Sequence, residues 1–410
     1  MDKCLLICCG KSQENAFPFA SNLMNLARST IFRLVFKPYC WKDLGLAYLA
    51  ASLLENGYEC DILDLRTCVP SKKEKIVKKE AKKYDWLGFS FMTYAYPFID
   101  YVIIGEGERA IVDLLSGKKL SEIAGLVYKK KDKIVANPPK AIEDLDSLPF
   151  PARDKLKPID YRYLPISFLI SSRGCPSRCS FCVASRLFPK VRFRNPVKVV
   201  DELELLWSRG ERKVWFEDLD FSISLGHIQK ICDEIKKRKM TFDTLGAQIS
   251  VERTDIEKMK WMKKAGFTAL SFGIESLSPS SLKAIEKTIN PAIYPKKAIR
   301  LLKYARKLGF CIVSSYILGL PYQKRDAVMK ELKILKENVD ELNLYFYTPF
   351  PGTTDWERFK DKLITTDFSK FDTRHVVLRS ELSNEDLRDI FNLVYPFKER
   401  IKNFINLLTK

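Results

Sequence analysis

Three cysteines stand close together in the segment Arg173-Gly-Cys-Pro-Ser-Arg-Cys-Ser-Phe-Cys182, which has the spacing C-x3-C-x2-C. Three thiolates on one short loop can bind three irons of a cubane and leave the fourth iron open for a chelating ligand. Zinc is disfavoured, because structural zinc sites usually take a fourth protein ligand, and the chain contains only 2 histidines. The pattern therefore predicts a [4Fe–4S] cluster held by Cys175, Cys179 and Cys182.

Four later segments could complete a ligand site at the ends of strands. Carboxylates in them could accept hydrogen bonds from a ligand, and glycines let the backbone approach a ligand closely. Core packing or turn chemistry would explain any one of the four alone. The segments are Trp215-Phe-Glu-Asp218, Phe272-Gly-Ile-Glu-Ser276, Tyr316-Ile-Leu-Gly-Leu-Pro321 and Thr348-Pro-Phe-Pro-Gly-Thr353.

The cysteine spacing, followed by these segments in this order, resembles the radical S-adenosylmethionine (SAM) superfamily over roughly residues 170–355. The resemblance implies that SAM chelates the open iron and that its reductive cleavage yields a 5′-deoxyadenosyl radical. Two positions depart from the family, since Ser250 and Glu252 stand in the region where many relatives carry Arg and Asp. The SAM contacts that the resemblance implies are Phe181, Glu217, Asp218, Gly273, Glu275 and Gly319.

The elements that must position these residues follow from alternating apolar and helical patterns. We expect an α/β fold, with a truncated doubly wound, Rossmann-like N-terminal domain, a partial (β/α)6 barrel and a helical C-terminal tail. In the first domain, strands are expected at 4–9, 58–65, 86–92 and 101–104, and helices at 44–56 and 71–83. The expected domains are 1–143, a linker at 144–165, the barrel at 166–355 and the helical region at 356–410.

The N-terminal domain resembles the cobalamin-binding domain that precedes the barrel in a large radical SAM subfamily, which includes methyltransferases and the anaerobic porphyrin-ring cyclase. The matching stretches are 44–65, 86–93, 100–108 and 145–154. Only 11 residues separate Gly88 from Asp100, although the family usually has a helix, a strand ending in Gly-Gly and a second helix there. We expect Trp86–Met92 to pair directly with Tyr101–Ile104. Either the domain is vestigial, or cobalamin binds in a reduced site.

Composition limits the partners. The net charge of +19 fits either a Lys-rich solvated surface or an anionic partner such as RNA. The 11 cysteines are scattered and odd in number, which favours a reducing, cytoplasmic location over a disulfide framework.

No apolar run approaches the roughly 20 residues of a transmembrane helix, and the N-terminus is interpreted as a strand, not as a signal peptide. The resemblance further implies an external electron donor of the ferredoxin or flavodoxin type.

The function predicted from these observations is SAM cleavage that functionalises an unactivated carbon. With cobalamin, C-methylation is expected; without it, a radical rearrangement or ring-forming step. The expected substrate is a small molecule, or a lipid-like or tetrapyrrole-like compound. A tRNA methylthiotransferase-like enzyme is an alternative, although residues 381–410 indicate a helix instead of an RNA-binding β-barrel. A binding protein that keeps the cluster without the reaction is a further alternative.

Overall fold

The structure is a computed structural model and describes residues 2–8, 39–40, 44–64, 70–90, 100–131, 133–158, 162–163 and 166–395. The chain divides into two compact units, Met1–Phe168 and Leu169–Lys410, which are described separately. The predicted finer boundaries at 143, 165 and 355 stay predictions.

The first unit contains a parallel sheet with the strand order β4-β1-β3-β8. Successive side chains of a strand point to opposite faces, and β1 shows this directly. Cys4 and Leu6 pack with helix α3, whereas Leu5 and Ile7 pack with Ile76 and Val77 of helix α4. Helices therefore cover both faces of the sheet, as predicted for a doubly wound domain. The elements are β1 (Lys3–Cys8), α3 (Leu44–Glu55), β3 (Glu59–Asp64), α4 (Pro70–Ala81), β4 (Trp86–Ser90) and β8 (Leu156–Pro158).

The predicted pairing of Trp86–Met92 with Tyr101–Ile104 is wrong. Strand β4 pairs with β1, while β5 (Tyr101–Ile103) belongs to a separate antiparallel sheet with the order β5-β6-β7. The physical reason is that the short stretch between β4 and β5 leaves no room for the long crossover of a parallel pairing, whereas β6 (Leu126–Lys130) and β7 (Lys133–Ala136) form an antiparallel hairpin whose strand β6 pairs with β5. Helix α5 (Gly107–Leu115) follows β5 and begins within the segment Gly105–Glu108. Residues 91–99, including Met92–Pro97, lie outside the described residues.

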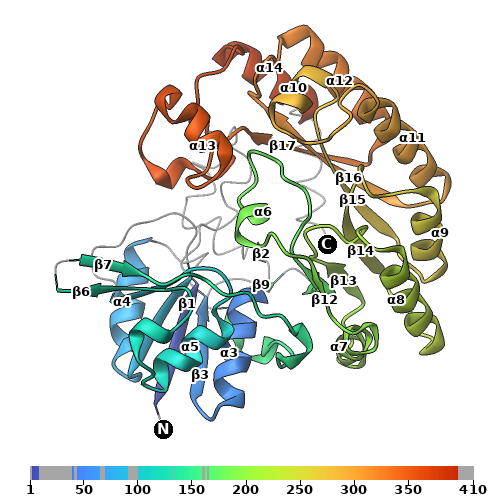
Figure 1. Ribbon diagram of the computed structural model, residues 1–410. Helices are drawn as coiled ribbons and strands as arrows, with labels where there is room; N and C mark the ends of the chain where they lie inside the picture. The colour runs from blue at the N-terminus through green and yellow to red at the C-terminus, as the bar shows by residue number, and fades with distance from the viewer. Residues whose placement is uncertain are drawn as a thin grey trace. The chain divides into compact units, whose positions relative to one another are not determined.

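The second unit contains a six-stranded sheet with the order β10-β13-β14-β15-β16-β17, in which the strands from β13 to β17 run parallel. This sheet confirms the partial barrel (Figure 1). Strand β14, which ends at Ser250, pairs with β13 and β15. The strands are β10 (Ser167–Leu169), β13 (Lys213–Phe216), β14 (Thr244–Ser250), β15 (Ala269–Glu275), β16 (Cys311–Leu318) and β17 (Glu341–Phe346). The helices between them are α7 (Pro196–Ser208), α8 (Leu225–Lys237), α9 (Ile256–Lys264), α10 (Pro279–Ala284), α11 (Tyr294–Lys307) and α12 (Arg325–Asn338).

The two faces of this sheet differ in chemistry. On one face, side chains such as Phe216, Leu245 and Phe272 are buried against the helices, which run along the outer side of the sheet in Figure 1. On the other face, Gln248 on the central strand β14 and Glu217, directly after β13, are exposed. The apolar face provides the core, and the polar face is left for a ligand.

Short elements complete the described chain. The pair of β11 (Ser172–Arg173) with β12 (Arg192–Phe193) brackets the cysteine segment. Helix α14 lies in the predicted helical tail, of which residues 396–410 lie outside the described part. The remaining elements are β2 (Tyr39–Cys40), β9 (Arg162–Tyr163), α6 (Ala184–Leu187), α13 (Thr354–Phe359), α14 (Asn384–Val394) and short 3₁₀ turns at Leu120–Glu122, Leu145–Ser147, Arg153–Lys155, Lys360–Lys362 and Phe368–Lys370.

Candidate functional site

The cysteine loop follows β11 and is folded back on itself. Gly174 has φ +99°, and a Cβ atom added there would lie 2.1 Å from the carbonyl oxygen of Lys190. The N–H of Cys175 donates to the carbonyl of Phe188 over 3.2 Å. Position 174 therefore requires glycine both for its left-handed backbone and for the close approach of the returning chain.

The other end of the loop is held by segments that follow the last three strands of the sheet. The N–H of Ser180 donates to the carbonyl of Ile285 over 3.0 Å, and the N–H of Asp355 donates to the carbonyl of Ser180 over 3.1 Å. Phe181 packs in an apolar cluster with Ile285 and Leu320. The loop thus contacts segments that follow β15, β16 and β17.

The three thiols of the loop form a donor set suited to an iron–sulfur cluster. Cys175, Cys179 and Cys182 are free thiols, of which Cys179 is buried and the others half-buried. Burial raises the pKa of Cys179 to about 11. The charge of Lys287 opposes this shift, whereas the neighbouring Cys182 and Cys175 add to it. In the described part of the chain no three His, Cys, Asp or Glu side chains converge on one metal ion. A cubane does not require such convergence, because each thiolate binds a different iron, so the donor set fits the cluster.

The two candidate carboxylates after β13 have different environments. The carboxylate of Asp218 is buried and accepts hydrogen bonds from the N–H of Ser171 (3.0 Å), the hydroxyl of Ser171 (2.8 Å) and the hydroxyl of Ser172. Burial raises its pKa, and the serine hydrogen bonds oppose that shift. Glu217 is exposed, yet desolvation and then Asp218 raise its pKa. A side chain that water reaches but protein largely surrounds is typical of a position inside an open concavity.

The candidate residues at the end of β15 lie in an irregular backbone. Glu275 has φ +67°, and the pairing of β15 with β16 shifts register between Gly273 and Glu275. The Glu275 carboxylate pairs with Nζ of Lys287 at 3.1 Å and accepts from the hydroxyl of Ser315 at 2.9 Å. A non-glycine residue in the left-handed region is strained, and such strain is often found at functional sites.

The glycine after β16 is fixed by a side-chain cap. Gly319 has φ +85°, and its N–H donates to Oε1 of Gln323 over 2.8 Å. The same oxygen accepts from the N–H of Leu320, while Nε2 of Gln323 donates to the carbonyl of Ile317. Gln323 therefore closes the turn that shapes this part of the site.

Arg253 is a functional candidate that the sequence analysis missed. Its Nη1 donates to Oγ of Ser177 over 2.8 Å and lies 3.4 Å from Oδ2 of Asp220. It follows Ser250 and Glu252, the two positions that depart from the family. Because many relatives carry an arginine in this region, its absence at Ser250 and Glu252 was the signal in the sequence for a nearby cation such as Arg253.

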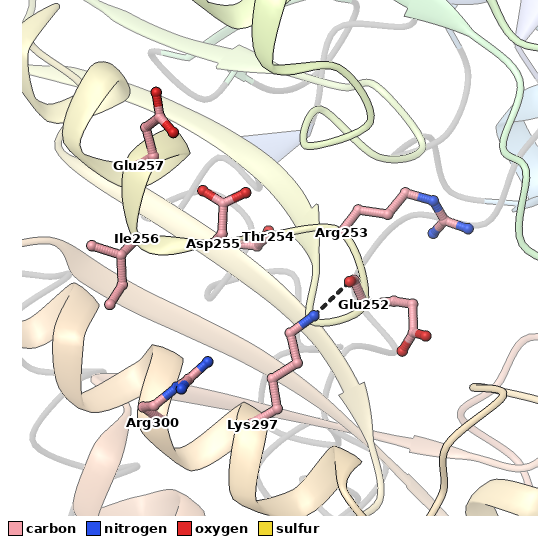
Figure 2. Close-up of a pocket in the computed structure, with 8 residues that line it drawn as sticks. All are labelled: Glu252, Arg253, Thr254, Asp255, Ile256, Glu257, Lys297 and Arg300. Carbon is pink, nitrogen blue, oxygen red and sulfur yellow. Dashed lines mark hydrogen bonds between the residues drawn. The ribbon is translucent and has the colours of Figure 1, made fainter.

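A depression of about 510 Å³, lined in part by Arg253, lies between the loop after β14, the start of α9 and α11. Figure 2 shows that Lys297 donates to the backbone of Glu252 (2.6 Å), whereas the side chain of Arg253 turns away from Lys297 and Arg300. None of the predicted site residues lines this depression. It is therefore not the candidate reaction site.

Comparisons with known proteins decide the family. The family model of the radical SAM superfamily matches residues 169–335. An uncharacterised methyltransferase of Pyrococcus horikoshii is 31% identical over 313 residues, which cover 73% of this chain and 67% of that protein. The chain belongs to the radical SAM superfamily. Its predicted cofactors, the [4Fe–4S] cluster and SAM, are those of this superfamily.

This radical SAM enzyme also has the two-unit organisation predicted for it. The anaerobic magnesium-protoporphyrin IX monomethyl ester cyclase of Rubrivivax gelatinosus is 29% identical over 293 residues, 67% of this chain and 52% of the cyclase. The chain thus spans about half the length of that relative. The structure of the radical SAM methyltransferase TsrM from Kitasatospora setae, with cobalamin and a [4Fe–4S] cluster bound, has a TM-score of 0.66 at 16% identity and covers 88% of this chain and 75% of TsrM. The fold of a cobalamin-binding-like domain followed by the radical SAM barrel is thereby confirmed.

Within the described residues, no helix has the length and apolar character needed to cross a bilayer.

Proposed function

We propose that Cys175, Cys179 and Cys182 hold the [4Fe–4S] cluster and that the neighbouring strand ends hold SAM. The observation that carries this proposal is the folded-back loop, which presents three free thiols next to the Glu275–Lys287 pair. When bound, the cluster and SAM supply a carbon radical that removes hydrogen from an unactivated carbon. The chain itself has to bind and orient SAM and the substrate, and it has to exclude water.

The candidate side chains divide this work according to their contacts. Glu217 and Glu275 offer carboxylate oxygens for the amino group and the ribose of SAM, while Gly273 and Gly319 let the backbone approach and Phe181 packs beside the loop. The carboxylate of Asp218 is occupied by Ser171 and Ser172. Asp218 therefore acts as a positioning residue that fixes the chain entering the cysteine loop.

The overall reaction we propose is cobalamin-dependent C-methylation of a small molecule. It is supported by the 31% identity to a protein described as a methyltransferase and by the fold shared with TsrM. The first unit would bind the cobalamin. The similarity to a cyclase that acts on a magnesium porphyrin ester supports a tetrapyrrole-like substrate.

The proposal includes a reducing compartment and an electron donor. An iron–sulfur cluster and free cysteines suit the cytoplasm better than an oxidising compartment. The described residues include seven free cysteines, Cys4, Cys60, Cys175, Cys179, Cys182, Cys232 and Cys311. A low-potential protein of the ferredoxin or flavodoxin type would supply one electron for each SAM cleaved.

Anaerobic reconstitution tests the cluster and SAM assignments. We expect about four irons per chain and, after reduction with SAM, release of 5′-deoxyadenosine. Changing the three loop cysteines to alanine should abolish both, whereas Cys232→Ala, a buried cysteine on α8, should abolish neither. Full iron loading of the triple variant would refute the ligand assignment.

Cobalamin binding has its own test. The protein is incubated with hydroxocobalamin, desalted and examined by visible absorption. Stoichiometric retention is expected for a C-methylating enzyme. Loss of all cobalamin on desalting would instead favour the rearrangement or ring-forming reaction.

A further inference from the structure

The outer side of the cysteine loop is strongly basic. Residues 161–200 contain no Asp or Glu but contain Arg162, Arg173, Arg178, Arg186, Lys190, Arg192, Arg194 and Lys198. Two of these cations are turned inward, because Arg192 and Arg194 are buried. Arg178, Arg186 and Lys190 are exposed.

Backbone contacts bring these exposed cations to one place. Arg178 lies inside the loop, between two of the cysteines. The carbonyl of Lys190 meets Gly174, and the carbonyl of Phe188 accepts from Cys175, so the chain from Arg186 to Lys190 lies against the start of the loop. Lys283 on α10 is also exposed, and α10 ends beside the loop, where Ser180 donates to Ile285.

The acidic groups next to this surface are already paired. Glu286 contacts Nη2 of Arg358 at 2.5 Å. Asp355 is fully buried and accepts from the hydroxyl of Tyr347 at 2.5 Å. These two carboxylates therefore already have partners of their own.

We propose that Arg178, Arg186, Lys190 and Lys283 form the docking surface for a small acidic electron-transfer protein. Charge complementarity steers such partners and raises their association rate, and this basic surface surrounds the loop that holds the electron acceptor. In the transfer, one electron leaves the reduced flavin or iron–sulfur centre of the donor and enters the cluster, and no bond in either protein forms or breaks. The inference rests on the proposed cluster at Cys175, Cys179 and Cys182.

The test compares two double charge reversals that change the net charge equally. R178E/K283E alters the proposed surface, and K330E/K333E alters two exposed lysines on α12. The probe is a purified bacterial flavodoxin. Its dissociation constant for the reconstituted enzyme is measured by flavin fluorescence at low and high salt, and cluster reduction by its hydroquinone is followed by absorbance.

We expect R178E/K283E to weaken flavodoxin binding about tenfold at low salt, with the difference shrinking as salt screens the charges. K330E/K333E should bind like the wild type, and all three proteins should release 5′-deoxyadenosine equally when dithionite replaces flavodoxin. If R178E/K283E loads iron poorly, K283E alone, which is remote in sequence from the cysteines, should still weaken binding.

Other outcomes would overturn the inference. Equal binding by R178E/K283E and the wild type would do so, as would equal weakening in both double variants. Loss of RNA binding by R178E/K283E with unchanged flavodoxin binding would assign the surface to a nucleic acid instead. Absence of 5′-deoxyadenosine with dithionite in the wild type would refute the proposed function, while the binding measurement would still report on the surface.

Discussion

Nη1 of Arg253 donates to Oγ of Ser177 over 2.8 Å, and this contact ties the loop after β14 to the loop that carries the three cysteines. The same Nη1 lies 3.4 Å from buried Asp220, whose Oδ1 accepts from the N–H of Ser222. Asp220 thereby orients the guanidinium toward the cysteine loop. Three loops that are far apart in the sequence are joined through one side chain.

Removal of this contact should loosen the cysteine loop. A hydrogen bond to a charged group contributes about 1.5–3 kcal/mol, so we expect Arg253→Ala to speed iron loss to a chelator by about tenfold or more. Ser177→Ala removes only the acceptor and should have a smaller effect, and Arg253→Lys should be intermediate. The measurement is the decay of cluster absorbance with an anaerobic chelator; wild-type decay in Arg253→Ala would contradict the role.

Gly174→Ala should block the loop geometry. The added Cβ would lie 2.1 Å from a backbone oxygen, which cannot move away as a flexible side chain can. Gly210→Ala is the matched control, because Gly210 has φ +81° but no atom within 4 Å of the added Cβ. Both variants carry the strain of a positive φ, roughly 1 kcal/mol or more. Only Gly174→Ala should also lose iron on reconstitution, and equal iron loading would show that the close approach is unimportant.

A buried ion pair supports the strand that enters the cysteine loop. Arg194 contacts Glu202 at 2.6 Å and donates to the carbonyl of Ile170 at 2.8 Å, and both side chains are almost completely buried. Arg194→Met leaves a buried carboxylate without its cation, so we expect a loss of about 3–5 kcal/mol in the free energy of unfolding.

Denaturant unfolding measures this loss, and R194M/E202M should recover most of it because no lone charge remains. Lys360→Met, which breaks an exposed pair with Glu357, should change nothing measurable. A double variant as unstable as Arg194→Met would show that the desolvated charge is not the cause.

Glu331 should make stability depend on pH. One oxygen of this buried carboxyl accepts from Ser276 (3.0 Å), the N–H of Leu277 (2.7 Å) and Tyr316 (2.9 Å), yet burial raises its pKa. A raised folded-state pKa means that the folded state holds the proton more tightly. The contribution to stability is therefore largest below the unfolded-state pKa of about 4.3 and falls as the pH rises through the folded-state pKa.

Glu331→Gln keeps an acceptor oxygen and removes the titration. The thermal midpoint of the wild type minus that of Glu331→Gln should decrease as the pH rises from the acid side toward neutrality. A difference that stays constant with pH would contradict the raised pKa.

The sequence alone predicted the cysteine loop, the order of strands around it and the doubly wound first unit. These are local signals, because thiol spacing and apolar periodicity are written in neighbouring residues. The pairing of Trp86–Met92 with Tyr101–Ile104 failed because a short connection indicates proximity but not the partner. The choice of β1 for β4 and of β6 for β5 depends on which edges are free in the folded sheet.

The sequence by itself thus determined the family, through the spacing of the three cysteines and the segments after them, and it named Cys175, Cys179 and Cys182 as the cluster ligands that we propose. Only the tertiary structure brought Arg253 to Ser177 and Asp220, turned Asp218 toward Ser171 and Ser172, and placed Lys283 beside the cysteine loop. The physical reason is that these contacts join residues dozens of positions apart, and their partners are selected by sheet order and side-chain direction rather than by local pattern.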